Sequence, residues 1–220
     1  MFKGYSFPKP VILQAVYFKL RFSLSYRDLE ELLSIRGVAV DHATIQRWVY
    51  KFSPLVEINF RKRRKPVGTS WRMDETYIKV KGEWMYLYRA VDKEGNTVDF
   101  LLTKRRNKLA AHKFLVKAIS YNGCPKVINI DKSGANKEAI RTYNKRCLKK
   151  IKIRQNKYLN NKVEADHRFI KWRTALMLGF KNFESASRTL NGIEIIRMIK
   201  KEQVTFPRAT FYKTFCSLAA

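Results

Sequence analysis

The chain has 220 residues, of which 45% are hydrophobic, enough for one good core and a small additional domain. It carries 46 Lys and Arg against 18 Asp and Glu, and this net charge of +28 makes nucleic acid the first candidate partner and an anionic membrane surface the second. We expect no membrane span or signal peptide, because Lys19 and Arg21 interrupt the apolar segment 11–24. Three widely spaced cysteines without a zinc spacing fit a reducing cytosol.

Residues 10–52 predict three helices, with Ser25 and Asp41 as the caps of the second and third. Two short helices joined by a tight glycine-containing turn are typical of a helix-turn-helix. The exposed face of the third helix presents Gln46 and Arg47, which can pair with adenine and guanine in a major groove. An ordinary three-helix packing domain with a solvated face is the alternative.

A basic linker is expected over residues 54–70, after a first domain at 1–53, because Pro54 should end the third helix. The linker contains the run Arg61-Lys62-Arg63-Arg64-Lys65. Such a run is either a solvated tether or a strap that follows DNA phosphates. We favour the strap, because a tether does not need so many cations.

Three β-prone runs separated by short glycine-containing turns predict an antiparallel meander, at residues 71–80, 84–91 and 97–103. Helical and apolar strand patterns then alternate, and they lead to a helix capped by Asn161 and a last long helix at about 183–203. This order predicts an α/β protein in which the helix-turn-helix domain precedes a ribonuclease H-like, mixed-sheet catalytic domain. We place the catalytic domain at 71–205 and a C-terminal tail at 206–220.

Two acids fall on strands that lie side by side in this fold. Asp74 is in the middle of the first strand, and Asp131 ends the apolar fourth strand. The helix carrying Glu164 would complete a cluster of carboxylates, whose repulsion Mg²⁺ or Mn²⁺ would relieve. Each acid also has a structural reading: a buried salt bridge for Asp74, and a helix cap for each of the other two. Asp92 and Asp99 are interpreted as turn and strand-surface acids.

The helix that begins near residue 161 places bases beside the third acid. At about 100° per residue, His167, Arg168 and Lys171 share a face with Glu164, while Asp166 points away. These bases could hold a DNA phosphate next to the metal ions. Asp166 is otherwise a solvated or salt-bridged residue, and it is the main alternative to Glu164 as the third acid.

Taken together, these motifs resemble the DDE transposases of the insertion-sequence-six family. The likeness lies in Ser23-Leu24-Ser25-Tyr26-Arg27-Asp28-Leu29, Val40-Asp41-His42-Ala43-Thr44-Ile45-Gln46-Arg47-Trp48, Trp71-Arg72-Met73-Asp74-Glu75-Thr76-Tyr77, Asp131-Lys132-Ser133-Gly134-Ala135-Asn136 and Asn160-Asn161-Lys162-Val163-Glu164-Ala165-Asp166-His167-Arg168. The resemblance implies that Asp74, Asp131 and Glu164 are the catalytic, metal-binding triad, and that Lys171 is the accompanying base that contacts DNA.

The resemblance also implies a function: metal-dependent cleavage and transfer of double-stranded DNA, at the terminal inverted repeats of an insertion element and in target DNA. The expected protein is at least a homodimer, cytoplasmic and bacterial, associated with the nucleoid and not with a membrane. Two alternatives remain open at this point. One is a decayed, inactive transposase that only binds DNA, and the other is a ribonuclease H-like nuclease or resolvase that joins no ends.

Overall fold

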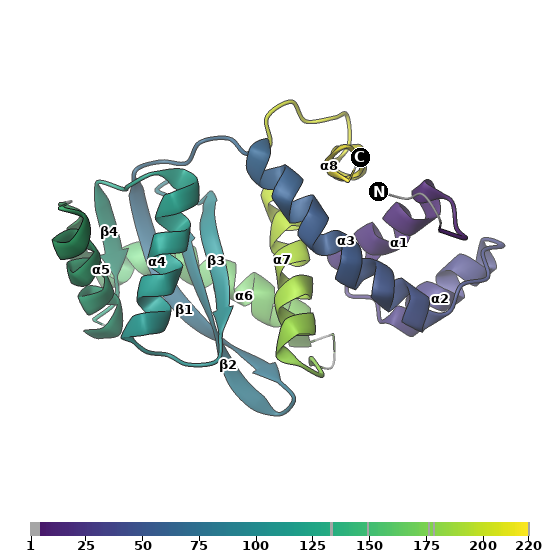
Figure 1. Cartoon of the computed structure of the whole chain (residues 1–220), viewed down its shortest axis with the longest axis horizontal. Coiled ribbons are helices and arrows are strands. Elements are labelled where there is room, and N and C mark those ends of the chain that lie inside the picture. Colours follow the sequence, from purple (N-terminus) through teal and green to yellow (C-terminus); the bar gives the residue numbers. More distant parts are fainter. Residues whose placement is uncertain (1–4, 133, 149, 176, 178, 220) are drawn as a thin grey trace. The chain divides into compact units, whose positions relative to one another are not determined.

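The computed structural model describes residues 5–132, 134–148, 150–175, 177 and 179–219, and Figure 1 shows its elements. These residues form two compact units. A helical unit combines the chain up to Lys65 with the C-terminal segment that follows Ala175, and a sheet unit spans Pro66–Ala175. None of the described helices is both long and apolar enough to cross a lipid bilayer.

The helical unit is built from α1 (Lys9–Arg21), α2 (Tyr26–Ile35), α3 (His42–Lys62), α7 (Phe183–Lys200) and α8 (Phe211–Leu218). Its first three helices begin as predicted. The Ser25 hydroxyl accepts a hydrogen bond from the Asp28 backbone N–H, and the Asp28 carboxylate accepts one from the Ser25 N–H, so a capping box starts α2. Asp41 caps α3 by accepting from the Thr44 N–H. The three helices are confirmed, while the reading of DNA by α3 stays a prediction.

The predicted end of α3 at Pro54 is wrong, because the helix continues to Lys62. Phe52, Val56 and Phe60 are each at most 1% exposed and follow one another at four-residue spacing, so a single buried stripe crosses the proline. Burial of each side chain contributes about 1.5–3 kcal/mol, which together outweighs the cost of roughly 3 kcal/mol for an interior proline. The first half of the predicted linker is therefore helix.

The C-terminal helices belong to the helical unit, which differs from the predicted limits 71–205 and 206–220. Gly192 of α7 shows how closely this helix packs. A Cβ added there would lie 2.5 Å from Leu20 Cδ2 of α1 and 3.1 Å from Ser53 Oγ of α3. Apolar periodicity identifies α7 as a helix, but it does not reveal which core the helix joins.

The sheet unit contains β1 (Ser70–Val80), β2 (Glu83–Val91), β3 (Thr97–Thr103), α4 (Lys108–Asn122), β4 (Val127–Ile130), α5 (Gly134–Cys147), β5 (Lys152–Gln155), the short 3₁₀ helix η1 (Lys157–Asn160) and α6 (Asn161–Ala175). The strands form one sheet in the order β3-β2-β1-β4-β5. The meander β1-β2-β3 is antiparallel, and β1, β4 and β5 are parallel. This mixed sheet has the predicted ribonuclease H-like order, which is confirmed.

Helices cover both faces of this sheet. Trp71 and Met73 of β1 form a core with Phe114 of α4 and Ile140 of α5. The other face of β1 packs against α6. Figure 1 shows α4 crossing in front of the sheet and α6 behind it. Alternate residues of β1 therefore face different helices, so Asp74 lies on the α6 face and Glu75 on the α4 and α5 face.

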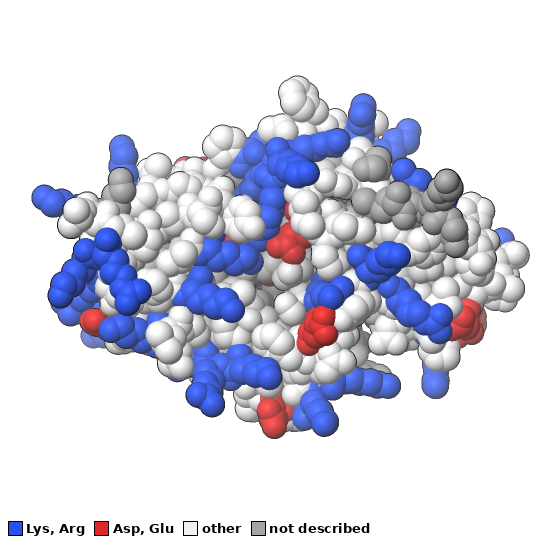
Figure 2. Space-filling model, in the orientation of Figure 1, with Lys and Arg blue, Asp and Glu red and all other residues white. Residues whose placement is uncertain are grey.

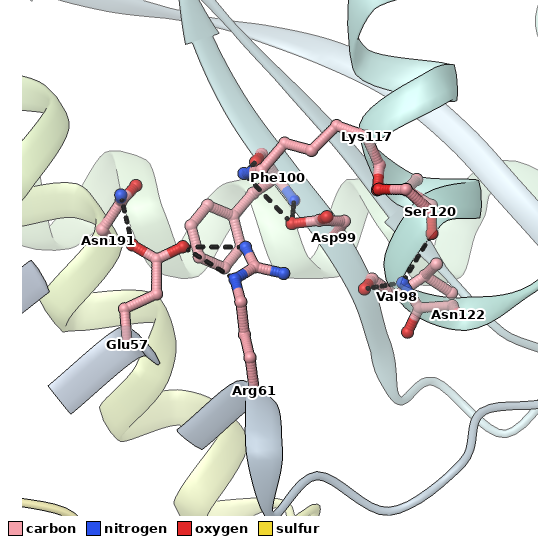
Figure 3. A network of polar contacts seen from close by, with 10 residues as sticks. Glu57, Arg61, Val98, Asp99, Phe100, Lys117, Ser120, Asn122 and Asn191 are labelled. Atoms are coloured by element: carbon pink, nitrogen blue, oxygen red, sulfur yellow. Dashed lines mark hydrogen bonds and ion pairs between the residues drawn. The ribbon is translucent and has the colours of Figure 1, made fainter. Parts of the chain in front are cut away.

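Two acids outside the candidate site have structural roles. Asp92 is the turn acid that the sequence predicts, because its carboxylate accepts hydrogen bonds from the backbone N–H groups of Glu94 and Asn96. Asp99 was expected at the strand surface, and this is wrong. It is 1% exposed and lies 3.3 Å from Lys117 Nζ, which reaches it from α4 (Figure 3). The ion pair permits the burial that strand alternation alone did not predict.

Candidate active site

Asp74 in β1 and Asp131, directly after β4, occupy equivalent positions along two neighbouring parallel strands. The pairing of β1 with β4 runs from Ser70 opposite Val127 to Arg72 opposite Asn129. Both acids come two residues beyond that last pair, so both belong to the α6 face. Adjacent strands lie about 4.8 Å apart, and β4 ends at Ile130. The topology therefore brings the two acids together where the shorter strand stops.

A small amide network ties the start of α6 to β4. Asn129 Nδ2 donates to the Asn160 side-chain oxygen at 2.6 Å and to the Asn156 carbonyl at 2.9 Å. Asn129 Oδ1 accepts from the Asn156 N–H at 3.3 Å. Glu164 follows in the first turn of α6 and is exposed. This network fixes the chain that carries the third acid to the strand that leads to Asp131. The sequence signal for it is a polar residue inside the otherwise apolar Val127-Ile128-Asn129-Ile130, and sequence reasoning missed it.

The pKa of Asp74 is affected by the other carboxylates of the candidate site. Burial is the largest cause that raises the pKa of Asp74 to about 7, and repulsion by the adjacent Glu75 is the next. Repulsion by Asp131 and Glu164 adds to the rise, so these acids, remote along the chain, lie within electrostatic reach. His167 Nδ1 is 3.6 Å from Asp74 Oδ2, too far for a hydrogen bond.

The donor chemistry of these carboxylates suits a hard divalent cation. Mg²⁺ and Mn²⁺ prefer oxygen ligands, and a cation among the acids would remove the repulsion that raises the pKa of Asp74. In the part of the chain that the structure describes, no three His, Cys, Asp or Glu side chains already lie close enough to hold an ion. A shared site therefore requires side-chain movement, and the exposed Glu164 has room for it.

The four side chains of α6 that the sequence places on one face differ in how exposed they are. Glu164, Arg168 and Lys171 are exposed. His167 differs from them in being only 6% exposed, with its ring toward Asp74, so its contact with a DNA phosphate stays a prediction. The helix itself begins at Asn161, directly after η1, so this residue is its first residue and not its cap.

Asp166 is salt-bridged, one of the two states expected for it. It is 5% exposed, and its Oδ2 lies 3.0 Å from Nη2 of the fully buried Arg89. Across the sheet, Glu75 accepts a hydrogen bond from Asn136 and forms an ion pair with Arg106. The sequence gives no local signal for either partner. These pairings leave Glu164 as the exposed acid of the first turn of α6.

The predicted DNA contacts of the helical unit fall into two groups. Gln46 and Arg47 are exposed and line an open groove of about 920 Å³ between α3 and the start of α7. The basic run 61–65, expected to follow DNA phosphates, does not form a separate extended segment. Its first two residues belong to the last turn of α3, and Arg64 forms an isolated β-bridge with Val204. Arg61 already pairs with Glu57 at 2.8 Å (Figure 3).

Other members of the same basic run are held in different ways. Arg63 Nη1 donates to the Ser217 carbonyl at 3.1 Å, whereas Lys62 and Lys65 are exposed. Figure 2 shows Lys and Arg side chains spread over the visible face with few acids between them. The charge excess is thus a property of the surface, and any DNA contact of this run remains a prediction.

A ribonuclease H-like sheet with one acid within β1 and another directly after the neighbouring β4 is typical of one class of enzyme. Residues 68–203 match the family model described as a DDE domain, and the protein is a DDE-type polynucleotidyl transferase. The transposase for insertion sequence-like element IS431mec of Staphylococcus aureus is 40% identical over 206 residues, which cover 91% of this chain and 89% of that one. The transposase of IS257 in transposon Tn4003 of the same species gives the same values. The chain belongs to the insertion-sequence-six family of DDE transposases.

The chain is also similar to solved structures of integrase catalytic cores, and one of them illustrates the match. It is the HTLV-2 integrase catalytic core domain in complex with magnesium, in its trimeric form. The match has 19% sequence identity and a TM-score of 0.47, and it covers 60% of this chain and 88% of that one.

Proposed function

We propose that this transposase cuts and joins DNA at the terminal inverted repeats of its own element, with Asp74, Asp131 and Glu164 as the catalytic carboxylates. The observation that carries the proposal is the register of β1 and β4, which sets Asp74 level with Asp131, and both Asp131 and Glu164 add to the rise in the pKa of Asp74. Such mutual repulsion destabilises a fold, and acids that are held together at this cost are typical of functional sites.

The three carboxylates would hold Mg²⁺ or Mn²⁺. Bound ions of this kind activate an attacking water or 3′-hydroxyl and stabilise the leaving oxygen of a phosphodiester. The chain supplies the framework: Asp74 and Asp131 approach from adjacent strands, and Glu164 approaches from the helix above them. Arg168 and Lys171 lie exposed on the same helix, where they would hold the DNA phosphate in line.

Double-stranded DNA is the proposed partner of both units. Gln46 and Arg47, at the exposed start of α3, would read bases in a major groove. The net charge of +28 supports binding to phosphates along the rest of the surface. Two ends must be cut in one complex, so we propose a homodimer or larger assembly. Its substrate places it on the bacterial nucleoid.

The test uses a plasmid with two inverted-repeat ends and purified protein in Mg²⁺. The unmutated chain should cut and join the ends, and Asp131→Asn should bind them with unchanged affinity but yield no product. Joining by Asp131→Asn would overturn the triad. An unmutated chain that binds ends and joins none in Mg²⁺ or Mn²⁺ would identify the inactive, DNA-binding alternative, and cutting without joined product would identify a nuclease.

A further inference from the structure

The tip of the β1–β2 hairpin carries an exposed group of aromatic side chains. Tyr77 lies opposite Tyr86 across the two strands, with ring centroids 5.3 Å apart. Trp84 meets the Tyr77 ring edge-on, with centroids 6.2 Å apart. Trp84 is 60% exposed and Tyr77 43% exposed, whereas Tyr86 is partly buried. We call Tyr77, Trp84 and Tyr86 the aromatic platform.

The platform continues the sheet face that α4 and α5 cover nearer the core. Met73 and Tyr88, on the same face of β1 and β2, belong to the buried core. Cross-strand packing accounts for the Tyr77–Tyr86 pair. It does not account for Trp84, most of whose surface is still in water. Exposed aromatic side chains that follow one another along a sheet are the surface on which unpaired bases stack.

Positive charges surround these rings. Lys79 Nζ lies 5.8 Å from the centre of the Trp84 ring. Arg106 Nη1 donates to the Tyr77 hydroxyl at 3.4 Å, and Arg106 also pairs with Glu75 on the same sheet face. Arg106 ends the exposed run Lys104-Arg105-Arg106 that follows β3, and Lys104 and Arg105 add two more cations. The exposed Glu83 lies opposite Val80 and, by strand alternation, points to the other face of the hairpin. The surface therefore matches a polyanion with flat, apolar faces.

The platform lies close to the candidate active site along one strand. Tyr77 is three residues from Asp74, which is about 10 Å of extended chain, and the two side chains point to opposite faces of the sheet. In the described sheet, β1 pairs with β4 only as far as Arg72 opposite Asn129, so the β1 edge next to both positions is not covered by that strand. A DNA strand that passes this edge can reach both faces of the hairpin.

We propose that the aromatic platform binds unpaired bases of a DNA strand next to the cutting site. The proposal rests on the proposed function for its substrate, but not on the catalytic triad. A second copy of the chain is a poorer occupant, because a symmetric contact would set two copies of the same cationic patch, each with Lys79 and Arg106, against each other. Unpaired bases, by contrast, offer rings for stacking and phosphates for the cations.

The test compares single-stranded and duplex DNA in EDTA at about 0.2 M salt, where phosphate contacts alone are weakened. The background variant is Trp172→Phe, because Trp48 and Trp71 are buried and Trp172 is exposed. A twelve-nucleotide oligo(dT) should quench the fluorescence of Trp84. Replacing Trp84 by Ala should weaken oligo(dT) binding about 10-fold, because stacking contributes about that much for each base. It should leave binding of a blunt-ended duplex of two strands unchanged.

Trp84→Phe is the matched control, because it keeps an aromatic ring at the same position, and it should retain oligo(dT) affinity within about 3-fold. Equal losses on single-stranded and duplex DNA, or no loss on either, would overturn the proposal. So would a lower assembly mass for Trp84→Ala in sedimentation, which would identify the hairpin as a contact between copies. Joining of plasmid ends is measured separately, so failure of the transposase function is distinguishable from failure of the platform.

Discussion

Arg89 Nη2 lies 3.0 Å from Asp166 Oδ2, and both side chains are almost completely buried. The pair joins β2 to α6 beneath the candidate active site. A carboxylate committed to a buried guanidinium is a structural element, and a metal ligand in the same place would leave the arginine charge without compensation. This contact gives Asp166 a structural role and so favours Glu164 as the third acid of the site, a choice that the sequence alone left open.

Asp166→Asn should destabilise the protein by about 3 kcal/mol, because it leaves a buried guanidinium without its counter-charge. Glu164→Gln, on the exposed side of the same helix, should change the free energy of unfolding by less than about 0.5 kcal/mol. Urea unfolding measures both. End joining should behave in the opposite way and be lost in Glu164→Gln. If Asp166→Asn were as stable as the unmutated chain but could not join ends, Asp166 would be the third catalytic acid and Glu164 would not.

The raised pKa of Asp74 predicts a pH dependence of stability in EDTA. Because its pKa rises from 3.8 to about 7 on folding, the folded chain binds more protons than the unfolded chain between these values. Stability is therefore lost through this group as the pH rises from about 4 to about 7. Asp74→Asn removes that loss, so at pH 8 its free energy of unfolding should exceed that of the unmutated chain by up to about 4 kcal/mol. Urea unfolding measures the difference.

The same comparison should show little difference near pH 4.5, where the Asp74 carboxyl is protonated in the folded chain. Added Mg²⁺ at pH 8 should stabilise the unmutated protein and so reduce the difference in free energy of unfolding between it and Asp74→Asn. An Asp74→Asn variant that is less stable than the unmutated chain at pH 8 in EDTA would contradict the account of a repulsive cluster.

Gly192→Ala tests the close packing of α7 in the helical unit. Alanine is the better helix former by about 1 kcal/mol, but its Cβ would lie 2.5 Å from a Leu20 side chain that is itself 1% exposed. We expect a net loss of about 1–3 kcal/mol in thermal or urea unfolding. Gly134→Ala on α5 is the control, since nothing lies within 4 Å of its added Cβ. It should leave stability unchanged or raise it.

Asn129→Leu tests the amide network that holds the entry to α6. The variant removes the bonds to Asn156 and Asn160 and should reduce end joining by about 10-fold or more, as supporting contacts around metal ligands do. Hydrogen exchange over residues 156–161 should become faster. Asn144→Leu is the control, because Asn144 makes a similar pair of bonds with Ile151 between α5 and the approach to β5. Equal losses of joining in both variants would indicate a general loss of stability.

The order of elements and the helix caps could be predicted from the sequence, because both are local. Periodicity places β1, the meander and the alternating helices, and this order alone puts Asp74 beside Asp131. The continuation of α3 through Pro54 could not be predicted, because a local breaker is overcome there by burial on both sides. Assignment of α7 and α8 to the helical unit depends on contacts between segments far apart in the chain.

The partners of buried polar side chains could not be predicted from the sequence either. Asp99 with Lys117, Glu75 with Arg106 and Asn129 with Asn160 each join residues from different elements. A sequence pattern shows that a polar residue is in an apolar strand, but the partner that makes its burial tolerable comes from the fold.

The central claim is that three carboxylates share divalent ions, and metal uptake tests it most directly. Calorimetry would titrate Mn²⁺ into the protein bound to a DNA end, using the unmutated chain and a variant that combines Asp74→Asn with Asp131→Asn. The account predicts saturable uptake by the unmutated chain and none by the variant, with DNA binding equal in both. Uptake that is absent from the unmutated chain, or the same in both proteins, would contradict it.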